Sequence, residues 1–297
     1  MTAYNHTIVF EPGLPGAAVT QNYGTATITL RETQAPGQAL PEDYKRTFFN
    51  NQGRSIALYT DRPAARTAVG QPWQFDIEGV VTFRWESGDN TICYRPGEGF
   101  TPDLLKYWTF HNVLPLFFTI EERYDFLHAG AVLLDDSAVL FSAESFGGKS
   151  TMTDFFIRKG HAMLSDDKVA VQEREGAFLA VPSYPYHRPY RNTEDLGRFV
   201  DAMAPVPVRI RAVYELTRAA PDAEIAITPL SGVAKFKSLR FSSEINLSFL
   251  KPERFRVLSA MANCVPVYRV SVPWELRRLE EVYAALYRHA ASIDCMA

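Results

Sequence analysis

Apolar and polar positions alternate with a period of two over much of residues 1–100, which predicts a β-rich N-terminal region. A segment rich in Pro, Gly and Gln at 34–41 interrupts this pattern and predicts a loop. The runs 80–85 and 91–94 are separated by a Gly-Asp-Asn turn, which predicts a hairpin. Two more short runs, 25–30 and 55–59, predict further strands.

A helical pattern begins after these strands. Thr101 can cap the helix, with Pro102 at its first position and Asp103 in its first turn. We expect Pro115 to bend or break the helix, because proline lacks the N–H that an inner turn uses. The apolar run 108–120 is too short to span a bilayer, and polar residues interrupt it.

The motifs that carry chemistry all follow residue 123. We therefore expect a β-rich domain at 1–122 and an α/β catalytic domain at 123–297. The N-terminal domain has no motif of its own and is free to recognise the substrate. An exposed sheet edge can dock an extended peptide by strand addition. A lid or a surface for homo-oligomerisation is the alternative role.

Residues 142–151 read Ser-Ala-Glu-Ser-Phe-Gly-Gly-Lys-Ser-Thr and directly follow the apolar run 137–141. A strand, a glycine-rich turn and Lys-Ser at a helix start are typical of a Walker A phosphate-binding loop (P-loop), whose N–H groups point at anionic oxygens. In such a loop Lys149 reaches the β- and γ-phosphates and Ser150 ligates Mg²⁺. The expected nucleotide-binding residues are Ser145, Phe146, Gly147, Gly148, Lys149, Ser150 and Thr151.

The segments beside this loop favour the same interpretation. Two apolar runs within 131–141 flank an Asp-Asp turn and predict a hairpin that leads into the loop. Residues 152–159 predict a helix with Phe155 and Ile157 available for packing, and Gly160 stands where a C-cap belongs. A strand–helix turn that binds no ligand is the alternative.

Two adjacent carboxylates, Asp166 and Asp167, end the next short apolar run. A strand that delivers acidic side chains beside a phosphate-binding loop can hold Mg²⁺ and accept the proton of an attacking hydroxyl. Neighbours in a regular strand point to opposite faces, so we expect the two residues to have different roles. A plain Asp-Asp turn is the alternative, because Asp favours turns.

The stretch from His128 to Val171 resembles the catalytic core of HPr kinase/phosphorylase, a family of bacterial serine kinases. That family has a His-Gly segment, a hairpin, G-x-S-G-x-G-K-S, a helix and then G-H-x-L-x-x-D-D. The counterparts here are 128–130, 143–150 and 160–167, at the family's spacing. The resemblance implies an α/β P-loop domain like the C-terminal domain of that family, with a core related to PEP carboxykinase.

The resemblance also implies roles for single residues. Asp166 would be the general base for the acceptor serine, Asp167 would lie near Mg²⁺ or the substrate, and His128 would lie near the reacting phosphate. Ala143 and Phe146 stand where the family pattern has glycines. The family's glycine-rich signature linked to phosphorylase activity has no counterpart after Asp167, so we interpret the chain as resembling a relative of the family and not the enzyme itself. His161 matches the pattern too, and we expect it to pack or cap.

A Pro- and Tyr-rich segment at 183–191 is a candidate for the remaining site residues. An arginine near the transferred phosphate would stabilise the charge of the transition state, with Arg188 the first choice and Arg191 the second. A surface loop packed by its own aromatics is the alternative. The tyrosines that could stack on adenine are Tyr184, Tyr186 and Tyr190.

We expect two C-terminal segments to have a structural role and no role in the site. Lys235 and Lys237 alternate with apolar residues, which favours a half-buried strand. Residues 274–291 predict an amphipathic helix that packs on the domain.

Composition is that of a soluble cytoplasmic enzyme. The chain has 297 residues, is 46% hydrophobic and carries a net charge of −3, which gives no indication of a nucleic acid or membrane partner. The three scattered cysteines, Cys93, Cys264 and Cys295, predict reduced thiols. The N-terminal residues show no signal-peptide pattern.

The sequence therefore predicts a kinase that uses ATP and Mg²⁺ and transfers the γ-phosphoryl group to a serine of a protein or peptide. Relatives of HPr kinase without the phosphorylase signature are similar to kinases that tailor ribosomally made precursor peptides, including lasso-peptide precursors. Two alternatives stay open. One is a kinase of a small hydroxyl compound such as free serine, and the other is a nucleotide sensor without catalytic activity.

Overall fold

The computed structural model describes residues 1–14, 24–35, 37, 39–49, 53–61, 69–86, 88–144, 146–188, 194–241 and 251–293. Its contacts divide it into two units, with the division between Arg123 and Tyr124. Short stretches before Gly197 and before Pro252 are grouped with the first unit, so the second unit is not one continuous run of chain. The roles that the sequence suggests for the two domains stay predictions.

The first unit is built on a mixed sheet. Its strands are β1 (Thr2–Ala3), β2 (His6–Glu11), β3 (Ala26–Glu32), β4 (Arg46–Phe49), β5 (Ser55–Thr60), β6 (Trp73–Ile77), β7 (Val81–Trp85) and β8 (Thr91–Pro96), with a 3₁₀ turn η1 (Glu42–Tyr44) before β4. They pair in the order β1-β2-β3-β8-β7-β6-β5-β4. The expected β7–β8 hairpin is confirmed, and Val81 pairs with Pro96.

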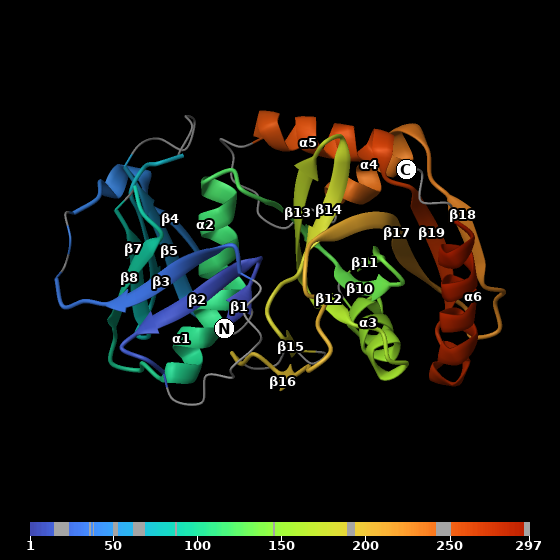
Figure 1. The fold of residues 1–297 in the computed structure, drawn as a ribbon, viewed down its shortest axis with the longest axis horizontal. Coiled ribbons are helices and arrows are strands. Elements are labelled where there is room, and N and C mark those ends of the chain that lie inside the picture. The colour runs from blue at the N-terminus through green and yellow to red at the C-terminus, as the bar shows by residue number, and fades with distance from the viewer. Residues whose placement is uncertain are drawn as a thin grey trace. The chain divides into compact units, whose positions relative to one another are not determined.

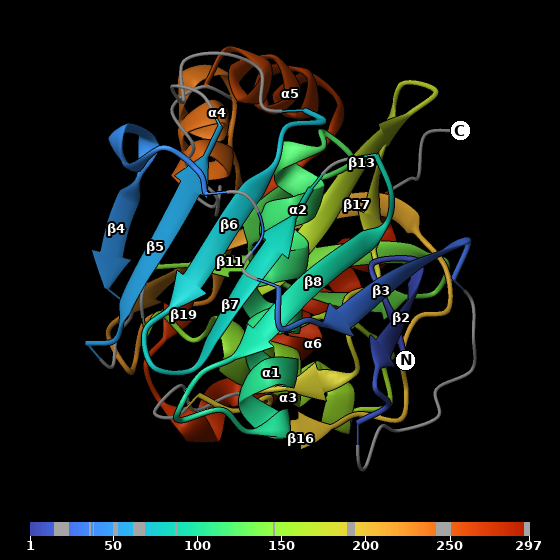
Figure 2. The ribbon, with the colours of Figure 1, turned by 90° about the vertical axis from the view of Figure 1, so that its left-hand side faces the viewer.

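A continuous helical segment covers one face of this sheet (Figure 2). It consists of α1 (Pro102–Trp108), a π-helical turn η2 (Thr109–Val113) and α2 (Leu114–Ile120). The hydroxyl of Thr101 accepts from the N–H of Leu104, as a helix cap should. Pro115 does not end the helix. It lies in the first turn of α2, directly after the wider π turn, where its missing N–H is tolerated.

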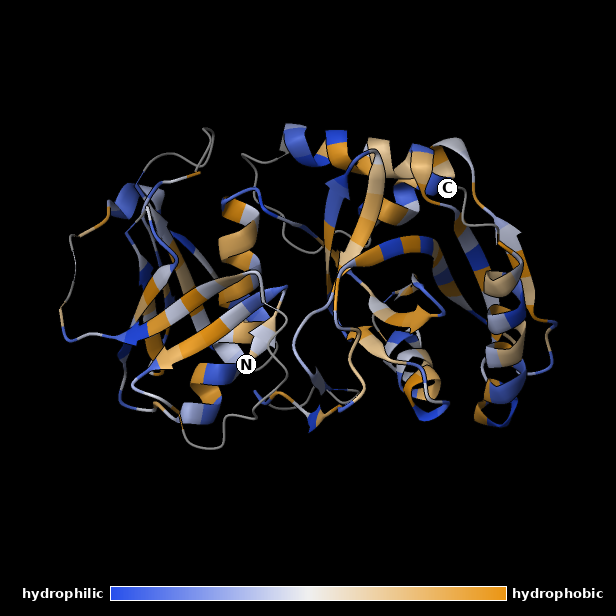
Figure 3. Ribbon diagram, in the orientation of Figure 1, coloured by the Kyte–Doolittle hydropathy of each residue, from blue (hydrophilic) through white to orange (hydrophobic). Residues whose placement is uncertain are grey.

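Aromatic contacts join α2 to the sheet, and Figure 3 shows that α2 is hydrophobic along most of its length. The Trp85 and Phe117 rings meet edge to face, with centroids 5.6 Å apart. Tyr4 and Phe118 make a similar contact at 5.7 Å. Burial of these large rings stabilises the packing of the helix on the sheet. No described helix is long and apolar enough to cross a membrane.

The second unit is built on a larger sheet. Its strands are β9 (Asp125–His128), β10 (Gly130–Leu134), β11 (Ser137–Ala143), β12 (Met163–Ser165), β13 (Lys168–Arg174), β14 (Ala177–Val181), β17 (Val208–Ala219), β18 (Ala226–Pro229) and β19 (Val267–Pro273). They pair in the order β12-β10-β11-β17-β14-β13-β9, and β19 joins β17 and β18. The strands β11, β17 and β19 are parallel to one another, whereas the expected β10–β11 hairpin is antiparallel.

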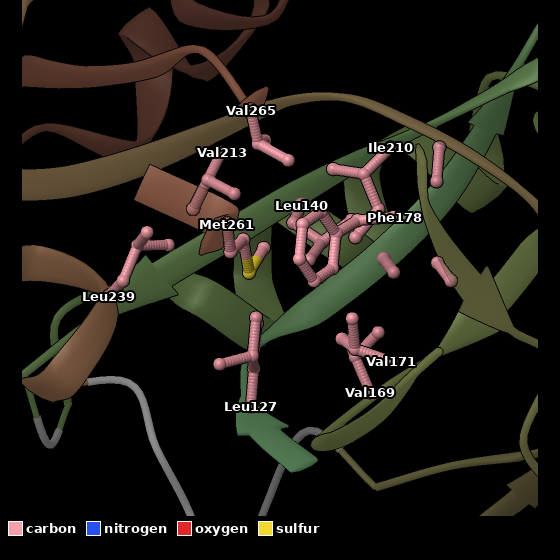
Figure 4. Packing of buried hydrophobic residues seen from close by; sticks show 14 of the residues in the cluster. Leu127, Leu140, Val169, Val171, Phe178, Ile210, Val213, Leu239, Met261 and Val265 are labelled. Carbon is pink, nitrogen blue, oxygen red and sulfur yellow. The ribbon is translucent and has the colours of Figure 1, made fainter. Parts of the chain in front are cut away.

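Helices cover both faces of this sheet (Figure 1). The helices are α3 (Lys149–Arg158), α4 (Gly232–Phe241), α5 (Lys251–Cys264) and α6 (Leu279–Ser292), with a 3₁₀ turn η4 (Leu276–Arg278) before α6. One core contains residues of α4, α5 and the sheet, and Met261 of α5 lies near Leu140 and Val213 (Figure 4). The other core contains residues of α3 and α6, including Phe156 and Leu286. The unit is therefore a three-layer α/β structure.

Some expectations about packing change. Residues 234–240 form part of helix α4 and not a strand, because Phe236 and Leu239 recur at helical spacing and pack into the core. In α3 the fully buried apolar residues are Met152 and Phe156, while the expected Phe155 and Ile157 are half-buried. Because Met152 and Phe156 are four positions apart, both lie on the helix face that packs against the sheet.

The predicted end of α3 is confirmed. Gly160 has φ of +95° and its N–H donates to Ile157 O, while the N–H of His161 donates to Phe156 O. This is a Schellman C-cap. His161 also packs on Phe156 and lies 3.0 Å from the Tyr283 hydroxyl, so it packs and caps as expected.

The described thiols are free. Cys93 is half-buried and Cys264 is exposed, and neither forms a disulfide. Cys295 lies outside the described residues.

Candidate active site

The loop from β11 to α3 turns through two residues with left-handed backbone conformation. Phe146 has φ of +62° and Gly148 has φ of +91°. Ala143 is not part of the turn, since it is the buried last residue of β11. A Cβ at Gly147 would lie 2.7 Å from Ala143 Cβ, so only glycine fits there. Ser145 lies outside the described residues.

Phe146 therefore occupies a conformation that glycine adopts more easily, at a cost of about 1–2 kcal/mol. Its side chain is 91% exposed, so the ring makes no demand on the packing of the loop. The carbonyl of Phe146 accepts a hydrogen bond from the Arg218 guanidinium. The chain thus turns at Phe146 and Gly148 with no glycine at the first two glycine positions of the motif.

The N-terminus of α3 offers uncapped N–H groups to an anion. Gly148 is its N-cap and provides no side-chain hydrogen bond, and the first turn contains no acidic residue. Lys149, Ser150 and Thr151 form this turn. The positive end of the helix dipole and the Lys149 ammonium therefore favour phosphate at the same place.

Close packing holds the start of α3 against β10. A Cβ at Gly130 would lie 2.0 Å from the Thr153 Oγ1 atom, so this position requires glycine. Thr153 is fully buried, and its hydroxyl donates to the Lys149 carbonyl oxygen at 3.0 Å. These contacts fix the position of Lys149 relative to the sheet.

Buried Lys149 and Asp167 form one cluster with half-buried His128. Lys149 Nζ lies 2.8 Å from Asp167 Oδ1, and His128 Nδ1 lies 3.1 Å from the same oxygen. Pairing of β13 with β9 places Lys168 opposite His128 and so brings Asp167 beside this histidine. The loop, the acidic pair and the upstream histidine, which are separate in the sequence, therefore meet at one point.

Asp166 has a different set of partners. Its Oδ1 atom lies 2.8 Å from His187 Nδ1, and its Oδ2 atom accepts from the backbone N–H of Arg188 at 2.8 Å. His187 is fully buried, and its Nε2 atom lies 3.4 Å from Asp154 Oδ1 on α3. Asp154 in turn pairs with Arg198 at 2.6 Å. A carboxylate–imidazole–carboxylate chain thus runs from α3 to Asp166.

The sequence predicts that the two aspartates lie on a regular strand, but the structure does not place them on one. They form a bend between β12 and β13, where the Ser165 hydroxyl donates to the Lys168 carbonyl oxygen at 2.9 Å. The bend allows neighbouring carboxylates to reach different partners within the same site. Asp166 and Asp167 therefore have different partners because of the bend and not because of strand alternation, and their different roles stay a prediction.

Electrostatics favour an ionised Asp166. Burial alone raises the pKa of this carboxyl, but the contact with His187 and the charge of Lys149 outweigh burial. The pKa of Asp166 therefore lies below its usual 3.8. At neutral pH the carboxylate is a charged acceptor, held in place on both oxygens.

The segment 183–188 is more ordered than a surface loop. It contains β15 (Tyr186–His187), which pairs with β16 (Arg198–Phe199). Tyr184 is 9% exposed and Tyr186 packs on Phe199 at 5.5 Å, so both have structural contacts. Arg188 is joined to Asp166 through its backbone, and the role of its guanidinium stays a prediction. Tyr190 and Arg191 lie outside the described residues.

Three residues of the site were not found from the sequence: His187, Asp154 and Arg198. The only signal was a histidine within a Tyr- and Pro-rich segment. Its meaning depends on pairing with a helix residue that lies far away in the chain, which no local pattern reveals.

The donor set fits Mg²⁺ bound together with phosphates. Ser150 and Asp167 offer a hydroxyl and a carboxylate oxygen, the ligand types that Mg²⁺ prefers. Among the described residues, no group of three or more His, Cys, Asp and Glu side chains could hold a metal alone. Mg²⁺ is commonly held by one or two protein oxygens plus the phosphates of the substrate, and this site provides that number.

Comparison with known proteins gives a limited result. No family model and no curated protein sequence matches this chain. The structure is similar to the HPr(Ser) kinase/phosphatase from Coxiella burnetii, with a TM-score of 0.35 and 12% identity over 56% of this chain and 96% of that one. A TM-score this low supports no conclusion about activity.

Proposed function

We propose that the second unit is an ATP-dependent kinase that transfers the γ-phosphoryl group to a serine hydroxyl of a protein or precursor peptide. One observation carries this proposal. The bend at Asp166 and Asp167 presents one carboxylate to the phosphate-loop lysine and the other to a histidine 2.8 Å away. A cation for the phosphates and an oriented acceptor for a proton are the parts that phosphoryl transfer requires.

The nucleotide phosphates bind at the start of α3 in this proposal. Backbone N–H groups of Gly148, Lys149 and Ser150 face the β- and γ-oxygens, and the Lys149 ammonium exchanges part of its contact with Asp167 for a phosphate oxygen. Ser150 and Asp167 hold Mg²⁺, which neutralises the negative charge of the phosphates. His128, 3.1 Å from Asp167, lies beside the transferred group and orients that carboxylate.

In the transfer step, the serine oxygen forms a bond to the γ-phosphorus while the bond from this phosphorus to the β–γ bridging oxygen breaks. The hydroxyl proton passes to Asp166, and ADP leaves with the bonding electrons. A carboxylate of low pKa is a weak base, so Asp166 mainly orients the hydroxyl and accepts its proton late, when the oxygen has become acidic. Arg188 is the candidate for stabilising charge on the transferred group.

The proposed acceptor is a peptide, and the first unit is the candidate region for its recognition. The strand β7 lies inside the sheet and is mostly buried, so it is a poor candidate for docking a peptide. The terminal strands β1 and β4 of the described sheet are better candidates for strand addition.

A panel of acceptors tests the proposal. The full chain is incubated with MgATP and serine-containing peptides, among them any short peptide encoded beside its gene, and phosphoserine is measured by mass spectrometry. Free serine and Ser→Ala peptides are the matched controls. Phosphorylation of free serine alone would indicate a small-molecule kinase. ATP binding without transfer to any acceptor would support a nucleotide sensor.

A further inference from the structure

A cavity of about 230 Å³ opens beside the phosphate loop within the second unit. It lies at the carboxyl ends of the parallel strands β17 and β19, where open α/β sheets bind ligands. Gly147 and Gly148 of the loop form one side of it. The other lining residues are Thr151, Met152, Leu216, Val272, Pro273, Trp274, Glu275, Leu276, Leu279 and Val282.

The size and chemistry of the cavity match a flat aromatic ring system. Pockets for whole ligands enclose roughly 300–1,000 Å³, so this cavity accommodates only part of a nucleotide. Its walls are mainly aliphatic and aromatic, which excludes the phosphates but suits a base. Trp274 is 45% exposed and Leu276 is 78% exposed, and large apolar side chains left open to solvent together mark a binding surface.

Trp274 is held at a fixed place beside the loop. The Arg218 guanidinium lies 3.9 Å from the centre of the indole ring and also donates to the Phe146 carbonyl oxygen. A Cβ at Gly148 would lie 3.4 Å from the Trp274 Cζ3 atom, so the ring edge reaches the loop itself. The aromatic wall and the phosphate loop are thereby joined in one rigid site.

The backbone N–H groups along the aromatic wall are engaged within the protein. The backbone N–H of Trp274 donates to the Ala219 carbonyl oxygen, and the backbone N–H of Glu275 donates to the Pro273 carbonyl oxygen. The Glu275 carboxylate accepts from the N–H of Arg277. The lining is mainly apolar, so stacking and apolar contact dominate on this side.

We propose that this cavity binds the purine base of the nucleotide, with Trp274 as its aromatic wall, and that it accepts adenine and guanine about equally. The proposal rests on the kinase function, because the loop has to hold the phosphates for the base to reach the cavity. It transfers the role of base binding from the tyrosines of 183–191 to the segment 273–279. An apolar pocket discriminates weakly between rings of the same size.

Calorimetry on the full chain tests this with three probes: MgATP, MgGTP and magnesium tripolyphosphate. We expect the Kd values of MgATP and MgGTP to agree within about threefold in the unmodified protein. Trp274→Ala should weaken both nucleotides by about tenfold or more, the amount that loss of base stacking produces. Binding of tripolyphosphate should change by less than about twofold, because this probe has no base.

Phe255→Ala is the matched control. Phe255 is an aromatic residue of α5, 62% exposed and not part of the cavity lining. The control should bind all three probes as the unmodified protein does. Equal weakening of tripolyphosphate and MgATP in Trp274→Ala, or no effect on MgATP, would overturn the base site. If tripolyphosphate and MgATP both fail to bind the unmodified protein, the phosphate loop assignment fails first, and the base site with it.

Fluorescence supplies an independent readout. Trp73, Trp85 and Trp108 are at most 2% exposed, so acrylamide quenching of the chain's four tryptophans reports mainly Trp274. MgATP and MgGTP should protect this residue from quenching, and tripolyphosphate should not. Protection by tripolyphosphate alone would indicate a loop movement and contradict a base contact.

Discussion

Lys149 Nζ and Asp167 Oδ1 are 2.8 Å apart, and the two side chains are only 6% and 9% exposed. An ion pair this deeply buried requires both partners, because either charge left alone in the protein interior is costly. The pair joins the first turn of α3 to the bend after β12. It is therefore both a stability element and the centre of the proposed phosphate site.

A double-mutant cycle on this pair separates its two roles. Lys149→Met and Asp167→Asn should each lower the free energy of unfolding by about 3 kcal/mol, since each leaves a buried charge without its partner. The double variant should lose less than the sum, with a coupling of about 1–3 kcal/mol in urea unfolding. Additive effects would mean that the two charges do not interact. In kinase assays, neither the Lys149→Met nor the double variant should transfer phosphate.

Asp166 and Asp167 should differ in kinetics. Asp166→Asn should lower kcat by about 10²–10⁴-fold while the Kd of MgATP stays within about threefold, because the amide keeps the shape but accepts no proton. Asp167→Asn should instead raise the Mg²⁺ and ATP concentrations needed for half-maximal rate. The measurement is steady-state kinetics with Mg²⁺ titration. Loss of nucleotide binding in Asp166→Asn with normal turnover at saturation would reverse the two assignments.

The His187→Gln variant tests whether His187 positions the Asp166 carboxylate and keeps it ionised. Burial raises the pKa of Asp166 and the contact with His187 lowers it, so removing His187 should move this pKa upward. Because transfer needs the carboxylate, the acidic limb of kcat/KM should shift to higher pH in the variant. Asp166 also stabilises the fold above its unfolded pKa of 3.8, and this contribution disappears as the pH falls through its lower folded pKa.

His161→Gln is the matched control for that experiment. His161 follows the C-terminal end of α3, where it packs on Phe156 and lies 3.0 Å from the Tyr283 hydroxyl. This control should lose some stability with no shift of the pH profile. A lower rate for His187→Gln without any shift of the acidic limb would show a purely structural role for His187.

The direction of the reaction is a further expectation. The glycine-rich signature that the HPr kinase family links to phosphorylase activity has no counterpart after Asp167, where this chain forms the short β13–β14 hairpin. Phosphorylated product incubated with Mg²⁺ and inorganic phosphate should therefore stay phosphorylated. Pyrophosphate release, followed by a coupled assay, would contradict this expectation. The forward reaction with MgATP in the same preparation shows that the enzyme is active.

Local patterns in the sequence were sufficient for the elements around the site. The hairpin β10–β11, the helix start at Lys149 and its glycine C-cap at Gly160 are confirmed, because each depends on residues that are neighbours in the chain. The replacement of motif glycines by Ala143 and Phe146 could not be interpreted without coordinates. Ala143 ends a strand, and Phe146 adopts a left-handed conformation with its ring in solvent.

The sequence by itself determined the strand, the glycine-rich turn and the helix start around Lys149, because these depend on neighbouring residues, and it predicted phosphate binding there beside two carboxylates. Only the tertiary structure decided what surrounds them. His187 reaches Asp166 and Asp154, and Trp274 reaches Gly148, across contacts between residues far apart in the chain. Such contacts follow from how strands pair and how helices pack on the sheet, and these depend on the whole core and not on any local pattern.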